Sequence, residues 1–210
     1  MTIRKGESWG TVGPPPTTAA LAHDNAEVRR VVVAARSAAT SIPPVRLAGG
    51  DLWRAIGGPT VRGRDGATEA ASVEVPLLPV DVVRVEANGE TSWFVAHLIA
   101  RRSWWRGEVV AAVNSQYVGG WDVAPRGHPN DGFVDLLRVS PRMPIRDRWR
   151  ARRRLPQGTH VPHPDIDVRR VASATIELER PMPIWLDGER WLTAATFTLT
   201  VEPDAFIACV

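Results

Sequence analysis

PMPIWLDGERW, residues 181–191, places an Asp-Gly pair between two apolar runs that each carry a tryptophan. An Asp-Gly pair flanked by strand-forming residues is a strong short-range signal for a β-hairpin. The same stretch brings Asp187 within two residues of Glu189, and paired carboxylates perform general-base chemistry when one orients or perturbs the other. Two interpretations are therefore open at this point, an ordinary turn and a working carboxylate pair.

The Asp-Gly pair lies in a long series of short strand-like runs. From Val73 onward, runs rich in Val, Ile, Leu, Thr and Trp alternate with turn residues, and Asn88-Gly89 supplies a second hairpin signal. Short strands with Pro and Gly between them are typical of a sandwich or barrel-like β domain. The expected strands are 80–86, 91–99, 107–114, 133–139, 168–179, 183–186, 191–202 and 205–209.

The N-terminal third has a different pattern. Residues 24–39 predict a helix, with Asp24 as its cap and Glu27 three positions later, as in a capping box. Residues 45–58 predict a short strand, a Gly-Gly turn and a short helix from Asp51, and 59–72 predict an exposed loop. We therefore expect an α+β, mostly β fold: a reduced α/β portion over 1–72 and an antiparallel β-sandwich domain over 73–210.

The composition of the chain excludes several kinds of site and of protein. The chain has 210 residues, 44% of them apolar, a net charge of +3 and a single cysteine, Cys209. An intramolecular disulfide and a cysteine-rich metal site are excluded. No apolar run approaches the roughly 20 residues that a membrane-spanning helix needs, and no signal peptide follows Met1. We expect a cytoplasmic protein, with a peripheral position at a membrane as the alternative.

The basic run at 145–154, IRDRWRARRR, is a candidate anion-binding segment. If it is helical, Arg146, Arg150 and Arg153 share one face. Arginine grips phosphate groups through two parallel hydrogen bonds, so a lipid phosphate or an anionic membrane surface is one expected partner. A solvated charged segment is the alternative. Nucleic acid is not expected, because no recognition helix or aromatic platform accompanies the arginines.

An acidic loop precedes the strand at 133–139. In NDGFVDLL, Asp131 lies in a turn that Gly132 makes possible. Magnesium is usually held by one or two carboxylates together with carbonyl oxygens and water. The loop is therefore a candidate cation site, with a plain connecting loop as the alternative.

Read in order, several stretches resemble one family of lipid kinases. They are GGDLWR (49–54), VNSQYVGGWDVAP (113–125), NDGFVDLL (130–137), GTHVPHPDIDVRR (158–170) and LDGER (186–190). Together they resemble the C-terminal part of the diacylglycerol kinase-like lipid kinases, the group that includes sphingosine kinases. The resemblance implies a β-sandwich that follows a nucleotide-binding α/β domain, with the site in the cleft between them.

The resemblance also implies roles for particular residues. Asp187 would be the general base on a lipid hydroxyl, with Glu189 supporting it in a charged network. Asp131, with the backbone of Phe133, would belong to a Mg²⁺-linked site. The turn of Gly49, Gly50, Asp51 and Arg54 would lie near ATP, although Ala48 and Gly50 replace two hydrogen-bonding residues of the family pattern. We expect Asp131 and Asp187 to lie on the rim of one hollow.

One feature of the family is missing from the sequence. The phosphate-gripping GGDGT loop has no match, and about 45 residues precede Gly49. Since phosphoryl transfer depends on clamping the phosphates, we predict a degenerate, non-catalytic relative that binds a lipid or a partner. The partner would be a second copy or another chain that completes the cleft. The alternative is an active lipid kinase that uses ATP and Mg²⁺.

Overall fold

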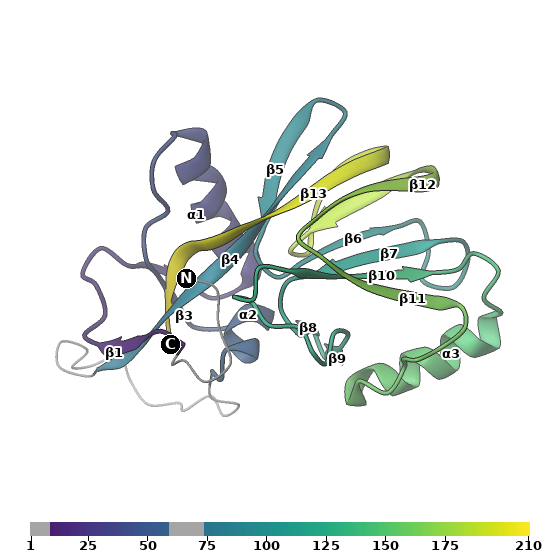
Figure 1. The fold of residues 1–210 in the computed structure, drawn as a ribbon, viewed down its shortest axis with the longest axis horizontal. Coiled ribbons are helices and arrows are strands. Elements are labelled where there is room, and N and C mark those ends of the chain that lie inside the picture. The colour runs from purple at the N-terminus through teal and green to yellow at the C-terminus, as the bar shows by residue number, and fades with distance from the viewer. Residues whose placement is uncertain (1–8, 59–73) are drawn as a thin grey trace.

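A computed structural model describes residues 9–58 and 74–210 (Figure 1). The first part holds β1 (Thr11–Gly13), β2 (Ala20–Ala22), α1 (Asn25–Ser37), β3 (Val45–Leu47) and α2 (Gly50–Ala55). The second part begins with β4 (Val75–Ala87), β5 (Glu90–Phe94), β6 (His97–Arg101), β7 (Val109–Val113), β8 (Tyr117–Val118), β9 (Trp121–Asp122) and β10 (Val134–Val139). It continues with α3 (Ile145–Arg154), a 3₁₀ turn (Leu155–Gln157), β11 (Ile166–Val171), β12 (Ser173–Leu186) and β13 (Glu189–Cys209).

Eleven of the described strands pair into one sheet, and β8 and β9 form a separate hairpin. The main path runs β1-β4-β13-β12-β6-β7-β10-β11, with β5 on β4. Every pairing along it is antiparallel. The sheet folds over so that β5, β13 and β12 face β6, β7 and β10 in Figure 1. Alternate side chains of these strands fill the space between the layers, including Phe94, Leu98, Ile184, Phe197 and Leu199, none more than 1% exposed. The predicted mostly β, antiparallel sandwich is confirmed.

The N-terminal segment packs on the same sheet. Strand β3 pairs parallel with the end of β13, and β2 pairs parallel with β3. The buried face of α1, with Val28 and Val32, shares a second core cluster with Val80 and Val82 of β4 and with Phe206 of β13. The segment 9–58 therefore packs on the sandwich through a shared apolar core.

The two hairpin turns and the first helix lie where the sequence predicts them. Asp24 caps α1 by accepting a hydrogen bond from the Glu27 backbone N–H. Both predicted hairpins are formed, and their central residues have the positive φ angles of a type I′ turn: 53° and 80° at Asn88-Gly89, and 49° and 90° at Asp187-Gly188.

Strand boundaries differ from the prediction in three places. The expected strand 91–99 is two strands, β5 and β6, because the chain turns at Val95 and Ala96. The runs 191–202 and 205–209 form one strand, β13, with an irregularity between Glu202 and Phe206. The runs 168–179 and 183–186 are redistributed over β11 and β12. The loop predicted at 59–72 lies outside the described residues.

Among the described residues, no helix is both long and apolar enough to span a lipid bilayer.

Candidate functional site

An open hollow of about 800 Å³ lies where four chain segments meet. The segments are the start of α1, the start of α2, the β8–β9 hairpin and the β12–β13 hairpin, and His97 at the start of β6 adds its side chain. Most of the lining residues are polar or glycine: Asp24, Asn25, Ala26, Gly50, Asp51, His97, Val118, Gly119, Gly120, Trp121, Asp187, Gly188 and Glu189. Four predicted site residues, Gly50, Asp51, Asp187 and Glu189, are thus brought together.

Asp187 is the most constrained carboxylate in this hollow. It is 5% exposed and accepts three backbone N–H groups, from Val95 at 2.8 Å, Ala96 at 2.9 Å and His97 at 3.0 Å. Its own N–H donates to the His97 carbonyl at 2.9 Å. Burial raises the pKa of Asp187, against the lowering influence of His97 and of the three N–H donors. The side chain therefore joins the β12–β13 turn to the bend between β5 and β6.

Asn25, Asp51 and His97 form a second polar group in the hollow. The Asn25 amide donates to Asp51 at 3.0 Å, and its carbonyl oxygen accepts the Leu52 N–H at 3.1 Å. His97 Nδ1 lies 3.5 Å from Asp51 Oδ2, longer than a normal hydrogen bond. Asn25, Asp51 and His97 are all buried, so the start of α1 is tied to the start of α2 beneath the hollow.

The Gly-Gly turn is shaped by close packing on α1. A Cβ atom at Gly50, whose φ is +91°, would lie 2.6 Å from Asn25 Oδ1. A Cβ atom at Gly49 would lie 2.5 Å from the His23 carbonyl oxygen. Only glycine fits at both positions, because the start of α1 packs directly against the backbone of this turn.

The remaining predicted residues of this region make contacts at its rim. Glu189 is partly exposed and pairs with Arg29 at 3.1 Å and with Arg30 at 2.7 Å, which joins the β12–β13 turn to α1. The support of Asp187 by Glu189 stays a prediction. Arg54 stacks over the Tyr117 ring at 3.9 Å and donates to the Gly119 carbonyl, so it supports the β8–β9 hairpin.

Asp131 lies elsewhere, and it does not line the hollow that Asp187 lines. Its carboxylate pairs with Arg170 and accepts the Phe133 N–H at 3.0 Å. Burial raises the pKa of Asp131, with Arg170 as the strongest opposing influence. The expectation of one common rim for Asp131 and Asp187 was wrong, because the loop at 130–133 folds onto β4 and β11 instead.

The donor set near Asp131 does not suit a magnesium ion as it stands. The guanidinium of Arg170 already neutralises the carboxylate, and the described residues contain no group of three or more acidic, histidine or cysteine side chains placed for a metal. The neighbouring Asp81 is fully buried and accepts N–H groups from Gly132 and Asp204. The magnesium site at Asp131 and Phe133 stays a prediction.

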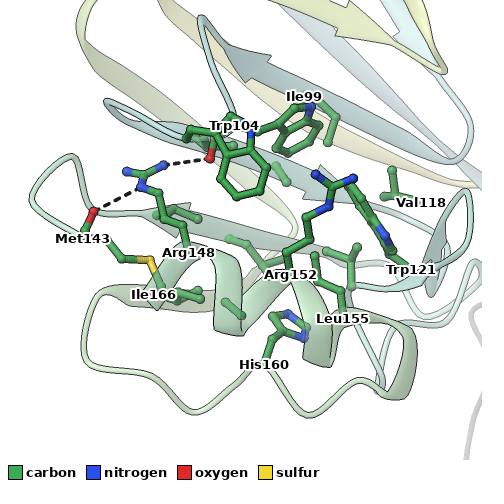
Figure 2. A pocket seen from close by; sticks show the side chains of 17 residues that line it. Ile99, Trp104, Val118, Trp121, Met143, Arg148, Arg152, Leu155, His160 and Ile166 are labelled. Atoms are coloured by element: carbon green, nitrogen blue, oxygen red, sulfur yellow. Dashed lines mark hydrogen bonds between the residues drawn. The ribbon is translucent and has the colours of Figure 1, made fainter. Parts of the chain in front are cut away.

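An apolar cavity of about 110 Å³ lies between α3 and the sheet (Figure 2). Trp104, Trp121, Leu155 and Ile166 are among its walls, and Arg148 and Arg152 reach along it from α3. His160 lies on the side opposite the sheet, 4% exposed, and burial lowers the pKa of its imidazole. The cavity is therefore lined almost entirely by carbon atoms and by a histidine that favours its neutral form.

The cavity and the hollow are neighbours. Val118 and Trp121, the residues on either side of the β8–β9 turn, line both of them. Trp121 also contacts Trp104 edge to face, with ring centroids 5.5 Å apart. An apolar compartment thus meets a polar one across a single hairpin.

Sequence reasoning missed Asn25, His97 and the apolar cavity. Asn25 directly follows the helix cap, and His97 interrupts an ordinary strand-like run, so neither has a local motif. Asn25 donates a hydrogen bond to Asp51, which lies 26 residues away in the sequence. The residues that line the cavity also come from distant segments, from Ile99 to Ile166. The arginines at 146, 150 and 153 lie on one helix, α3, and their contact with phosphate or a membrane stays a prediction.

The comparisons with known proteins agree with this fold. Three solved structures from Bacillus anthracis str. Sterne are similar, one described as a diacylglycerol kinase and two as proposed diacylglycerol kinases. They share 16% identity, with TM-scores of 0.56, 0.60 and 0.59, over 80% of this chain. The matched region spans about two thirds of their length, 66% for the first and 69% for the others. No curated protein matches the chain.

Residues 71–209 match the family described as the YegS C-terminal NAD kinase beta sandwich-like domain. The match covers β4 to β13, the strands that build the sandwich and both walls of the apolar cavity. The chain therefore belongs to the family of the YegS C-terminal β-sandwich domain.

Proposed function

We propose that this protein is a lipid-binding relative of the diacylglycerol kinases that does not itself transfer phosphate. One observation carries the proposal: the apolar cavity and the polar hollow meet at Val118 and Trp121. An amphiphile with a hydroxyl-bearing head needs such a pair of compartments, because its tail gains from leaving water while its head must keep hydrogen bonds.

The cavity volume limits what enters it. A dry apolar cavity of about 150 Å³ holds one benzene molecule, so 110 Å³ accepts only the end of an acyl chain. The rest of the chain would pass between Val118 and Trp121 toward the hollow. A longer tail would require α3 to move away from the sheet.

The lack of catalysis is supported by the contacts of the carboxylates. Asp187 accepts three backbone N–H groups, Asp51 accepts from Asn25, and Glu189 pairs with two arginines. Each of them has a structural partner that explains its position without a substrate.

Thermal unfolding with dioctanoylglycerol tests lipid binding. Ligand at about 100 times its dissociation constant adds roughly 2.7 kcal/mol to the free energy of unfolding, about 5–10 °C for a chain of this size. Ala151 lines the cavity, so Ala151→Leu should fill the space and abolish the shift. Ala172→Leu adds the same atoms at an exposed turn and should keep it. No shift for the unaltered protein, or equal shifts for both variants, would refute lipid binding in this cavity.

An active ATP-dependent and Mg²⁺-dependent lipid kinase is the second candidate. It is favoured by the meeting of Gly50 and Asp51 with Asp187, from two distant segments, in one hollow. Under this alternative, Mg-ATP stabilises the protein, and Asp187→Asn abolishes phosphorylation of dioctanoylglycerol while Asp167→Asn, at an exposed strand position, does not. Under our proposal, neither stabilisation by Mg-ATP nor phosphorylation occurs in the isolated protein. Light scattering in the same samples shows whether a second copy completes the cleft.

A further inference from the structure

Helix α3 has two faces of different chemistry. Arg148, Ala151 and Arg152 turn toward the sheet and line the apolar cavity. On the other side, Ile145 is 59% exposed and Trp149 is 52% exposed. They are four residues apart and therefore adjacent on the helix surface. The helix lies at the lower right edge of the molecule, far from α1 and α2 (Figure 1).

Positive charge is concentrated around these two apolar side chains. Arg146 and Arg150 have 76% and 66% of their side-chain surface exposed, and the Arg153 guanidinium lies 4.7 Å from the Trp149 ring. The ten residues of α3 contain six arginines and one aspartate, whereas the whole chain has a net charge of only +3. The rest of the chain is therefore net negative, so the net positive charge of the chain comes from this helix.

The same surface leads to the apolar cavity. A shallow hollow on the outside of α3 is lined by Trp105, Ile145, Arg146, Trp149 and Arg150. Trp105 is also a wall of the cavity, and the Arg152 guanidinium lies 5.2 Å from its ring. One tryptophan thus separates the exposed face of α3 from the interior.

We propose that the outer face of α3, made of Ile145, Arg146, Trp149, Arg150 and Arg153, docks on an anionic lipid bilayer. A bilayer is the partner that satisfies both halves of the face. Its acidic headgroups attract the arginines, while indole and aliphatic side chains enter the boundary between headgroups and acyl chains. A nucleic acid or an acidic peptide satisfies the arginines but leaves Ile145 without an apolar environment. The proposal goes beyond lipid binding in the cavity and does not depend on it.

Co-sedimentation with vesicles tests the proposal. The protein should bind vesicles of phosphatidylcholine with about one third phosphatidylglycerol far more strongly than pure phosphatidylcholine, and binding should weaken as salt shortens the Debye length below about 10 Å. Removal of three arginines at 146, 150 and 153 by alanine should lower the partition coefficient about a hundredfold, since each basic residue near an anionic surface contributes roughly fivefold.

Matched variants distinguish binding through this face of α3 from a general effect of the protein's positive charge. Alanine at Arg46, Arg126 and Arg190 removes the same charge from exposed positions outside α3 and should retain most of the binding. Lysine at 146, 150 and 153 should also retain it, and a melting curve shows that each variant is folded. Trp149→Ala should weaken binding severalfold but preserve its salt dependence.

Several results would overturn the proposal. They are equal binding to neutral and anionic vesicles, equal losses in the two triple-alanine variants, and tighter binding of a single-stranded oligonucleotide than of the anionic vesicles. Ala151→Leu, which fills the cavity, should leave vesicle binding unchanged. Failure of the cavity experiment and failure of the docking experiment are therefore distinguishable.

Discussion

Asp187 shows how one residue can fix both a turn and a remote loop. Its φ of 49° belongs to the left-handed region, which Asp and Asn tolerate better than most residues. Its carboxylate accepts N–H groups from Val95, Ala96 and His97, which would otherwise be buried without partners. The interpretation of the stretch as an ordinary turn is confirmed, and its catalytic interpretation stays a prediction.

Asp187→Asn should lower the free energy of unfolding by about 1–3 kcal/mol. Asparagine keeps the turn conformation and one acceptor oxygen for Ala96 and His97, but its amide cannot accept the Val95 N–H. Urea unfolding measures the change. The control, Glu189→Gln, alters partly exposed ion pairs and should cost less than about 1 kcal/mol. Equal effects of the two substitutions would mean that the three N–H groups do not depend on Asp187.

Gly50→Ala should be more destabilising than Gly57→Ala. Their φ angles are nearly the same, +91° and +90°, so the backbone strain of an added Cβ is similar. At Gly57 the Cβ would meet nothing within 4 Å, whereas at Gly50 it would displace the Asn25 amide at 2.6 Å. The difference between the two variants in urea unfolding should be about 1–3 kcal/mol, the cost of breaking a buried polar contact. Equal costs would show that Asn25 moves freely.

At the scale of the element, α3 is held by a buried arginine rather than by apolar packing alone. Arg148 is 5% exposed and donates to the carbonyl oxygens of Met143, Trp104, Ser140 and Gly107 (Figure 2 shows the first two). All four carbonyls lie in loops, two between β6 and β7 and two between β10 and α3. The helix and the cavity walls are therefore joined through one side chain.

Arg148→Lys should destabilise the protein by about 2–4 kcal/mol in urea unfolding. A lysine keeps the charge but has no planar fork, so it cannot reach carbonyl groups on opposite sides, and each lost bond to a charged donor costs about 1.5–3 kcal/mol. Arg150→Lys changes an exposed arginine of the same helix and should stay within about 0.5 kcal/mol. A similar small effect at Arg148 would contradict its anchoring role.

At the scale of the whole molecule, the N-terminal segment and the sandwich share a core. The sequence pattern predicts a domain boundary between residues 72 and 73. In the structure, Val28 and Val32 of α1 pack with Val80 and Val82 of β4, all of them 1% exposed or less. The hollow itself is built from both parts, since α1 and α2 form one side and the β12–β13 hairpin another.

Unfolding should therefore occur in one cooperative transition. Separation of residues 9–58 from the sheet would expose Val80, Val82 and Phe206 to water, so neither part has a reason to unfold first. Differential scanning calorimetry should give a calorimetric enthalpy equal to the van't Hoff enthalpy. Two resolved transitions would show that the two parts are independent domains.

The sequence by itself determined the features that depend on neighbouring residues. Asp24 as a helix cap, the two type I′ hairpins and the antiparallel, mostly β character follow from local backbone preferences and from the alternation of apolar side chains. These preferences act over a few residues and need no knowledge of the rest of the chain. Gly50 and Asp51, which line the same hollow as Asp187, were singled out because a family resemblance pointed to them.

Only the tertiary structure decided the partners of the polar groups. Asp131 meets Arg170 instead of the hollow, Asp51 meets Asn25, and Asp187 meets three N–H groups about 90 residues away. The apolar cavity likewise needs α3, β6, β7 and β10 at once. A buried polar group must find a partner wherever the packing of the apolar core brings one, and that packing is a property of the whole chain.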